Sequence, residues 1–168
     1  MGDNSGMNDK NVNRFGGRSG VDRVGRARAR RRALQALYAW QLSGCTAREA
    51  VAQFAHEQAR EQADLAYFEE LVFGVVKEYA ELDAQLRPYL DRDMEEVDPI
   101  ERAALRQAAY ELTHRLDVPY AVVINEAIEI VKKFGTEHGH TFVNGVLDQA
   151  AAKIRSVEVA AATGRHRD

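Results

Sequence analysis

The amino-acid sequence predicts an all-α protein, a bundle of six or seven helices joined by short loops. From residue 26 onward, apolar residues recur every three or four positions, which is the spacing of one face of a helix. Residues that start and stop helices bound these stretches, and the strongest start signal is Asp98-Pro99, an N-cap followed by proline at the first helical position. No turn signal lies between alternating strands, because Asn144-Gly145 falls inside a helical pattern.

Three helices are expected in the first half of the chain. The first leads from the arginine-rich segment to about residue 44, and the arginines either extend this helix or precede it. The second is expected over residues 46–60, with Thr46 as its N-cap. The third begins near residue 63 and continues until Pro88 interrupts the helical pattern.

The second half shows a more regular pattern of three further helices. The first of them starts at Pro99 and carries an apolar stripe as far as Leu116. The next is opened by Pro119 and ended by the glycine at position 135, and the last spans about residues 142–154. Inward faces are therefore predicted for Ile128 and Leu147.

The two ends of the chain differ in character from the helical part. Residues 1–25 are rich in Gly, Asn, Ser and Asp and hold few large apolar residues, so they are expected to be a disordered tail. The helical domain is expected over residues 26–157, and residues 158–168 are expected to be a flexible C-terminus.

Charge is distributed unevenly, although the net charge is only −3. Residues 1–32 hold nine basic and three acidic residues, whereas the rest of the chain holds 14 basic and 23 acidic residues. Five arginines lie within seven positions: Arg26, Arg28, Arg30, Arg31 and Arg32. Such a cluster favours contact with a polyanion, since guanidinium groups pair with phosphates and stack on bases. A solubilising charge run is the alternative interpretation.

The sequence contains no motif that is typical of catalysis, cofactor binding or metal binding. GxxxxGK[ST], GxGxxG, GxSxG, HExxH and CxxC are all absent. His138 and His140 beside Glu137 lack a third firm ligand, and the single Cys45 excludes an intramolecular disulfide. No transmembrane run or signal peptide is recognisable. We therefore expect a cytoplasmic protein that is not an enzyme, needs no cofactor and has no membrane partner.

Three long segments resemble the bacterial transcription antitermination factor NusB family. They read RRALQALYAWQLSG (residues 31–44), VDPIERAALRQAAYELTHRLDVPYAVVINEAIEIVKKFG (97–135) and FVNGVLDQAA (142–151). The likeness runs from about Arg26 to Ile154. It implies two small packed helical bundles, over about residues 26–90 and 98–157, and a role without catalysis.

The resemblance also implies partners. Family members pair with NusE, a ribosomal protein of the small subunit, and the pair binds boxA-type single-stranded RNA. Together they help the RNA polymerase antitermination complex read through terminators, notably in ribosomal RNA operons. A homodimer is possible, and the sequence leaves the oligomeric state open.

Site residues carried over from the family form two sets. The RNA set comprises the five arginines together with Gln35, Lys132, Lys133, Phe134, His138 and Phe142. The NusE-facing set comprises Tyr38, Glu101 and Arg102. Each has a structural alternative: Tyr38 fits a core edge, Glu101 fits a capping box, and the two phenylalanines fit apolar stripes. The TEHGH turn after residue 135 and the tail of about 25 residues depart from the family pattern.

Two other functions compete with this interpretation. One is a helical interaction module that makes no contact with nucleic acid. The other is a relative of the helical N-terminal domain of RNA cytosine methyltransferases without their catalytic domain, for which the sequence shows no glycine-rich nucleotide loop.

Overall fold

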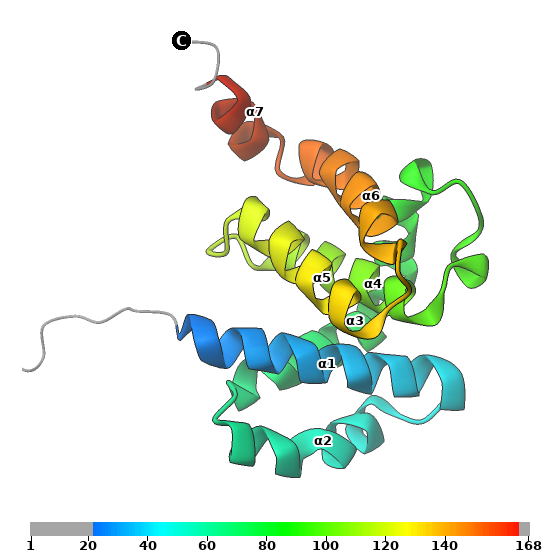
Figure 1. The fold of residues 1–168 in the computed structure, drawn as a ribbon, viewed down its shortest axis with the longest axis vertical. Helices are drawn as coiled ribbons and strands as arrows, with labels where there is room; N and C mark the ends of the chain where they lie inside the picture. Colours follow the sequence, from blue (N-terminus) through cyan, green and yellow to red (C-terminus); the bar gives the residue numbers. More distant parts are fainter. Residues whose placement is uncertain (1–21, 165–168) are drawn as a thin grey trace, which may run out of the picture.

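Helix α4, Pro99–His114, lies at the centre of the computed structural model, and four other helices pack against it (Figure 1). The structure describes residues 22–164. Eleven of the 16 residues of α4 are buried, so this helix is covered on nearly all sides. The described chain contains the following elements: α1 Arg23–Ser43, α2 Ala47–Glu61, α3 Leu65–Leu86, the short 3-10 helices η1 Arg87–Tyr89 and η2 Met94–Glu96, α4, α5 Tyr120–Phe134, α6 Gly139–Ile154 and α7 Ser156–Gly164.

The helices form two packed groups. Helices α1, α2 and α3 contact one another, and α4 contacts both α5 and α6, which also contact each other. The groups are joined because α3 and α1 pack against α4 (Figure 1). Buried apolar residues from both groups form one continuous core. The expectation of an all-α fold with two packed groups and six or seven helices is confirmed for residues 22–164. No helix in this range is long and apolar enough to cross a membrane.

Local capping explains where the helices begin and end. The Asp98 carboxylate accepts hydrogen bonds from the backbone N–H groups of Ile100 and Glu101, as the start signal predicts. Asp64 caps α3 in the same way. Helix α1 ends at Gly44, whose φ of 69° is the left-handed conformation that glycine adopts without strain.

The N-terminal boundary of the helical part lies earlier than predicted. The Asp22 carboxylate accepts a hydrogen bond from the backbone N–H of Gly25, so α1 begins at Arg23 rather than at residue 26. The arginines therefore extend the helix. The expected disorder of the tail otherwise falls on residues 1–21, which lie outside the described residues.

The C-terminal end of the described chain is helical where a flexible segment was expected from residue 158. Arg155 is buried and donates to backbone carbonyls at the end of α4 and in the loop after it, including those of Leu112 and Val118. Its guanidinium also holds Glu158 of α7 at 2.7 Å, and Glu158 accepts from the backbone N–H of Tyr120 at 2.9 Å. These contacts fix the start of α7 against the loop before α5.

Two predicted apolar faces differ from the structure. Leu116 is exposed because α4 ends at His114, two residues earlier than the stripe suggested. On α5, Ile130 is buried whereas Ile128 is only partly buried. Leu147 on α6 is fully buried, as predicted.

Candidate nucleic-acid and partner interface

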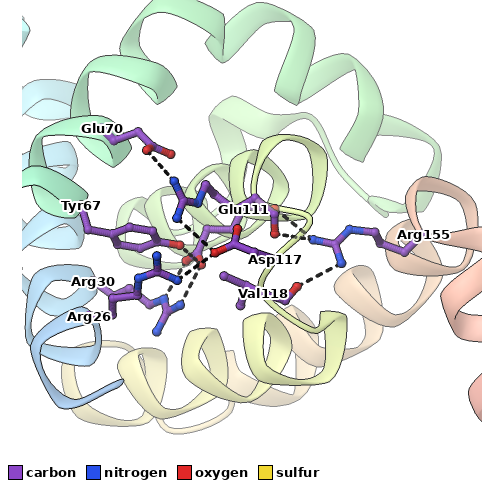
Figure 2. A network of polar contacts seen from close by, with 9 residues as sticks. Arg26, Arg30, Tyr67, Glu70, Glu111, Asp117, Val118 and Arg155 are labelled. Carbon is purple, nitrogen blue, oxygen red and sulfur yellow. Dashed lines mark hydrogen bonds and ion pairs between the residues drawn. The ribbon is translucent and has the colours of Figure 1, made fainter. Parts of the chain in front are cut away.

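Arg30 points into the protein, toward α4 (Figure 2). Its side chain is only 4% exposed, and its Nε and Nη2 donate to the two carboxylate oxygens of Glu111 at 2.8 and 2.9 Å. The Tyr67 hydroxyl donates to the same carboxylate at 2.6 Å. This bidentate pair joins α1 to α4, and the tyrosine adds α3.

The protonation states of this buried group follow from its contacts. Burial alone would lower the pKa of Arg30, but the hydrogen bonds and charge of Glu111 raise it above its usual range. Burial raises the pKa of Tyr67, and the Glu111 charge raises it further. Arg30 is thus a permanently charged structural group. The expectation that it contacts RNA is corrected here, because its guanidinium is neither exposed nor free.

Arg26 lies at the edge of the same network (Figure 2). Its guanidinium packs over the Tyr67 ring, 4.4 Å from the ring centroid, and pairs with Asp117 at 3.2 Å. Arg115 also packs over this ring and pairs with Asp117 and Glu70. Two acidic residues thus neutralise the partly exposed arginines around Tyr67.

Arg28 and Arg32 face the C-terminal end of α2. Arg28 donates to the backbone carbonyl of Glu61 at 2.6 Å. Arg32 pairs with the Glu61 carboxylate, lies 3.1 Å from Glu57, and donates to Gln35 at 2.7 Å. The hydrogen bond from Arg32 lowers the pKa of Glu61 below its usual range. Both arginines, and Gln35 with them, make contacts within the protein and keep partial exposure.

Arg31 lies on the side of α1 that faces α5. There it lines a surface groove of about 290 Å³ together with Lys132 and Lys133. The other lining residues are Ala27, Glu126, Glu129 and Ile130. Within residues 22–164 neither Arg31 nor Lys133 has an ion-pair partner, and Lys132 has only exposed Glu129 at 3.7 Å. We call this the basic groove. It brings together one arginine of the predicted cluster and both predicted lysines.

The structure places the two predicted phenylalanines and the predicted histidine in different environments. Phe134 and Phe142 are partly buried and pack against the core, which agrees with the stripe interpretation. The Phe142 ring also carries the Arg92 guanidinium 4.8 Å from its centroid. His138 is exposed at the start of α6 and makes no capping hydrogen bond with its side chain. Of these three residues, only His138 is exposed, and the two phenylalanines are partly buried.

The predicted partner residues lie near the junction of α1 and α4. Gln41 donates to the Pro99 carbonyl at 2.8 Å, so the end of α1 lies beside the start of α4. Tyr38, one turn earlier on α1, is partly exposed. Arg102 is also partly exposed, and burial together with the Arg106 charge lowers its pKa.

Glu101 does not protrude from this surface. It is 8% exposed, and a Cβ placed on Gly139 would lie 3.0 Å from its carboxyl group, so Glu101 fills the space between α4 and the start of α6. Burial raises the pKa of its carboxyl, and the Asp98 charge raises it further. Its expected role as an exposed partner contact is therefore corrected to a packing role.

The sequence pattern does not reveal that two glutamates of α5, Glu126 and Glu129, belong to the basic groove. Glu129 has i+3 and i+4 spacing relative to Lys132 and Lys133, and Glu126 lies one turn earlier on the same helix, which indicates ordinary surface pairing. The structure places these glutamates beside Arg31 as well. No local signal could have shown this, because the approach of α1 to α5 depends on packing. Among residues 22–164, no group of His, Cys, Asp and Glu could hold a metal ion.

Fold and surface together define an all-α protein whose candidate site is a binding surface, formed by a basic groove and by the junction of α1 with α4. The model of the NusB family matches residues 27–152, and the chain therefore belongs to the NusB family. The resemblance stated from the sequence is confirmed.

The relatives carry names that refer to transcription and not to catalysis. The chain is 69% identical over 145 residues to the transcription antitermination protein NusB of Xanthomonas axonopodis pv. citri (strain 306), covering 86% of this chain and 91% of that protein. It is 67% identical over 145 residues to the protein of the same name in Xanthomonas campestris pv. campestris (strain B100), with 86% and 91% coverage. This agrees with the expectation of a non-enzymatic protein.

Two solved structures share the fold. One is NusB of T. maritima, with a TM-score of 0.64, 30% identity, and coverage of 74% of this chain and 89% of that one. The other is a crystal structure of antitermination factors NusB and NusE in complex with double-stranded RNA, with a TM-score of 0.67, 26% identity, and coverage of 77% and 97%.

Proposed function

We propose that this protein is an RNA-binding transcription antitermination factor that pairs with a NusE protein on boxA-type RNA. The pair acts in the cytoplasm with the RNA polymerase antitermination complex, notably on ribosomal RNA operons. The RNA is held as a single strand, with phosphates on the basic groove and NusE at the junction of α1 and α4.

The observation that carries this proposal is the basic groove. Outside residues 1–32 the chain is acidic overall, yet Lys132 and Lys133 of α5 converge with Arg31 of α1 without strong internal partners. Bringing three cations together has an electrostatic cost that an anionic ligand offsets. The NusB–NusE–RNA complex among the solved relatives supports RNA and NusE as the ligands.

The proposal is tested by removing the charges of the groove. We expect the triple variant R31A/K132A/K133A to bind boxA-type single-stranded RNA at least about tenfold more weakly. The slope of log affinity against log salt should flatten by about 0.7 for each lost phosphate contact. Fluorescence anisotropy over a series of salt concentrations measures both quantities.

The matched control is R48A/R60A/K77A, which removes three exposed cations from α2 and α3. It should retain most of the affinity and nearly the wild-type slope. Equal losses in the two triple variants would contradict a dedicated groove, and no RNA binding by the wild type would favour the helical interaction module. The same titrations are repeated with a double-stranded RNA of the boxA-type sequence, because the solved complex holds double-stranded RNA.

A further inference from the structure

Two carboxylates stand among the three cations of the basic groove. Glu126 and Glu129 line it together with Arg31, Lys132 and Lys133. The other two lining residues are the small Ala27 and the apolar Ile130, and the groove between α1 and α5 has a volume of about 290 Å³. The groove therefore offers hydrogen-bond acceptors as well as cations.

The two glutamates differ in how firmly they are held. The Glu129 side chain is 72% exposed and lies 3.7 Å from the exposed Lys132. The Glu126 side chain is 32% exposed, and its Oε2 lies 3.9 Å from Nη1 of the buried Arg30. Arg30 is itself held by Glu111, so the ion-pair partner of Glu126 is a buried arginine, whereas that of Glu129 is an exposed lysine.

The chemistry of a carboxylate decides what can lie against it. It accepts hydrogen bonds and donates none, and it repels phosphate. Unpaired bases in single-stranded RNA expose their Watson–Crick edges to protein groups. For a nucleotide whose phosphates lie on Arg31, Lys132 and Lys133, the group that can lie favourably against Glu126 is therefore an N–H-bearing base edge.

We propose that Glu126 recognises a guanine base of the bound single-stranded RNA through its two carboxylate oxygens. Guanine is the base that presents two adjacent donors, the N1–H and the N2 amino group, at the spacing of a carboxylate. Adenine and cytosine present one amino group, and uracil presents one imide N–H. This inference rests on the proposed RNA-binding function and adds base specificity to it.

The experiment uses the full chain and three RNAs of eight nucleotides. One is all uridine, one has a central guanosine, and one has inosine in its place, which lacks only the N2 amino group. Wild-type protein should bind the guanosine RNA about tenfold more tightly than the inosine RNA. In E126Q this ratio should fall to about one, while the all-uridine RNA binds as well or better because a negative charge is gone.

Two further variants separate the specific contact from general effects. E81Q removes the same charge from an exposed glutamate of α3, outside the groove, and should keep the tenfold ratio. E126D keeps the charge but shortens the side chain and so withdraws the carboxylate oxygens from the base, and the ratio should therefore fall. Thermal melting of each variant checks that the fold is intact.

The outcomes distinguish this inference from the function on which it rests. A wild-type protein that binds all three RNAs equally, or an E126Q protein that keeps the full ratio, would overturn the role of Glu126 and leave RNA binding in place. Failure of the wild type to bind any of the three RNAs, together with failure to bind boxA-type RNA, would overturn both proposals.

Discussion

Two consecutive arginines of α1 have opposite roles. A helix turns by about 100° per residue, so neighbouring side chains leave the helix in different directions. Arg30 points to α4 and is neutralised by Glu111, whereas Arg31 points to the edge of α5 and lacks an ion-pair partner within the described residues. The charge of a residue therefore says little about its function until its direction is known.

The first prediction contrasts these two arginines. We expect Arg30→Ala to lower the free energy of unfolding by about 3–5 kcal/mol, because it leaves the buried Glu111 without its charge partner. Arg31→Ala should change it by less than about 0.5 kcal/mol. Urea unfolding followed by circular dichroism measures both. Similar stabilities for the two variants would mean that the pair between Arg30 and Glu111 is absent in solution.

The second prediction concerns a buried tyrosine. Burial raises the pKa of Tyr110 to about 12, helped by the charge and hydrogen bond of Glu70. The folded protein thus holds this proton more tightly than the unfolded chain, whose tyrosines ionise near about pH 10. The stabilising contribution is complete below about pH 10 and is lost as the pH rises through about 12.

Unfolding measured at a series of alkaline pH values checks this dependence. Tyr110→Phe should show a shallower loss of stability over that interval than the wild type, because one of the groups that drive it is removed. Tyr79→Phe, at a half-exposed position, is the control and should follow the wild type. Identical slopes in all three proteins would contradict the role of Tyr110.

At the scale of the helices, two helical glycines differ in the space around them and therefore in their effect on packing. Gly74 lies on α3 where a Cβ would come within 2.2 Å of the Tyr110 ring of α4. Gly145 lies on α6 with no atom within 4 Å of an added Cβ. The first glycine therefore permits close packing of α3 on α4, and the second only weakens its helix.

The third prediction follows from this contrast. Gly145→Ala should raise the free energy of unfolding by about 0.5–1 kcal/mol, since alanine is the better helix former. Gly74→Ala should lower it by about 1–3 kcal/mol through overpacking against Tyr110. Thermal and urea unfolding measure both signs. Stabilisation by both substitutions would show that α3 and α4 are less closely packed than in the structure.

At the scale of the whole molecule, one helix serves two surfaces. Arg31 and Tyr38 are seven residues apart on α1, about 10 Å along the helix axis and nearly on the same side. The N-terminal half of α1 contributes to the basic groove, and its C-terminal half approaches the start of α4. RNA and a partner protein can thus bind side by side along α1.

The fourth prediction is that these two surfaces act independently. Tyr38→Ala should weaken binding of purified NusE by about 1–3 kcal/mol, as expected for an aromatic anchor, and leave RNA affinity of the isolated protein within a few-fold. Glu101→Gln should change NusE binding little, because Glu101 is buried. Titrations of each variant with NusE and with RNA make the comparison.

A double variant completes this test. For binding to either ligand, R31A/Y38A should show the sum of the single effects within about 0.5 kcal/mol, as sites this far apart usually do. A larger coupling in binding to the isolated protein would indicate one shared surface instead of two.

The sequence by itself determined helices α1 to α6 of this protein, and the tertiary structure decided where α7 begins and which surface each charged residue faces. Caps such as Asp98 and Gly44 act within four residues of their partners, so local pattern sufficed to predict them. Capping by Asp22 was missed because a tail rich in polar residues obscured it. Arg30 and Glu111 lie 81 positions apart, and their pairing arises only when α1 packs on α4. The basic groove likewise exists only because α1 and α5 meet, since charges converge through packing and no local periodicity encodes that convergence.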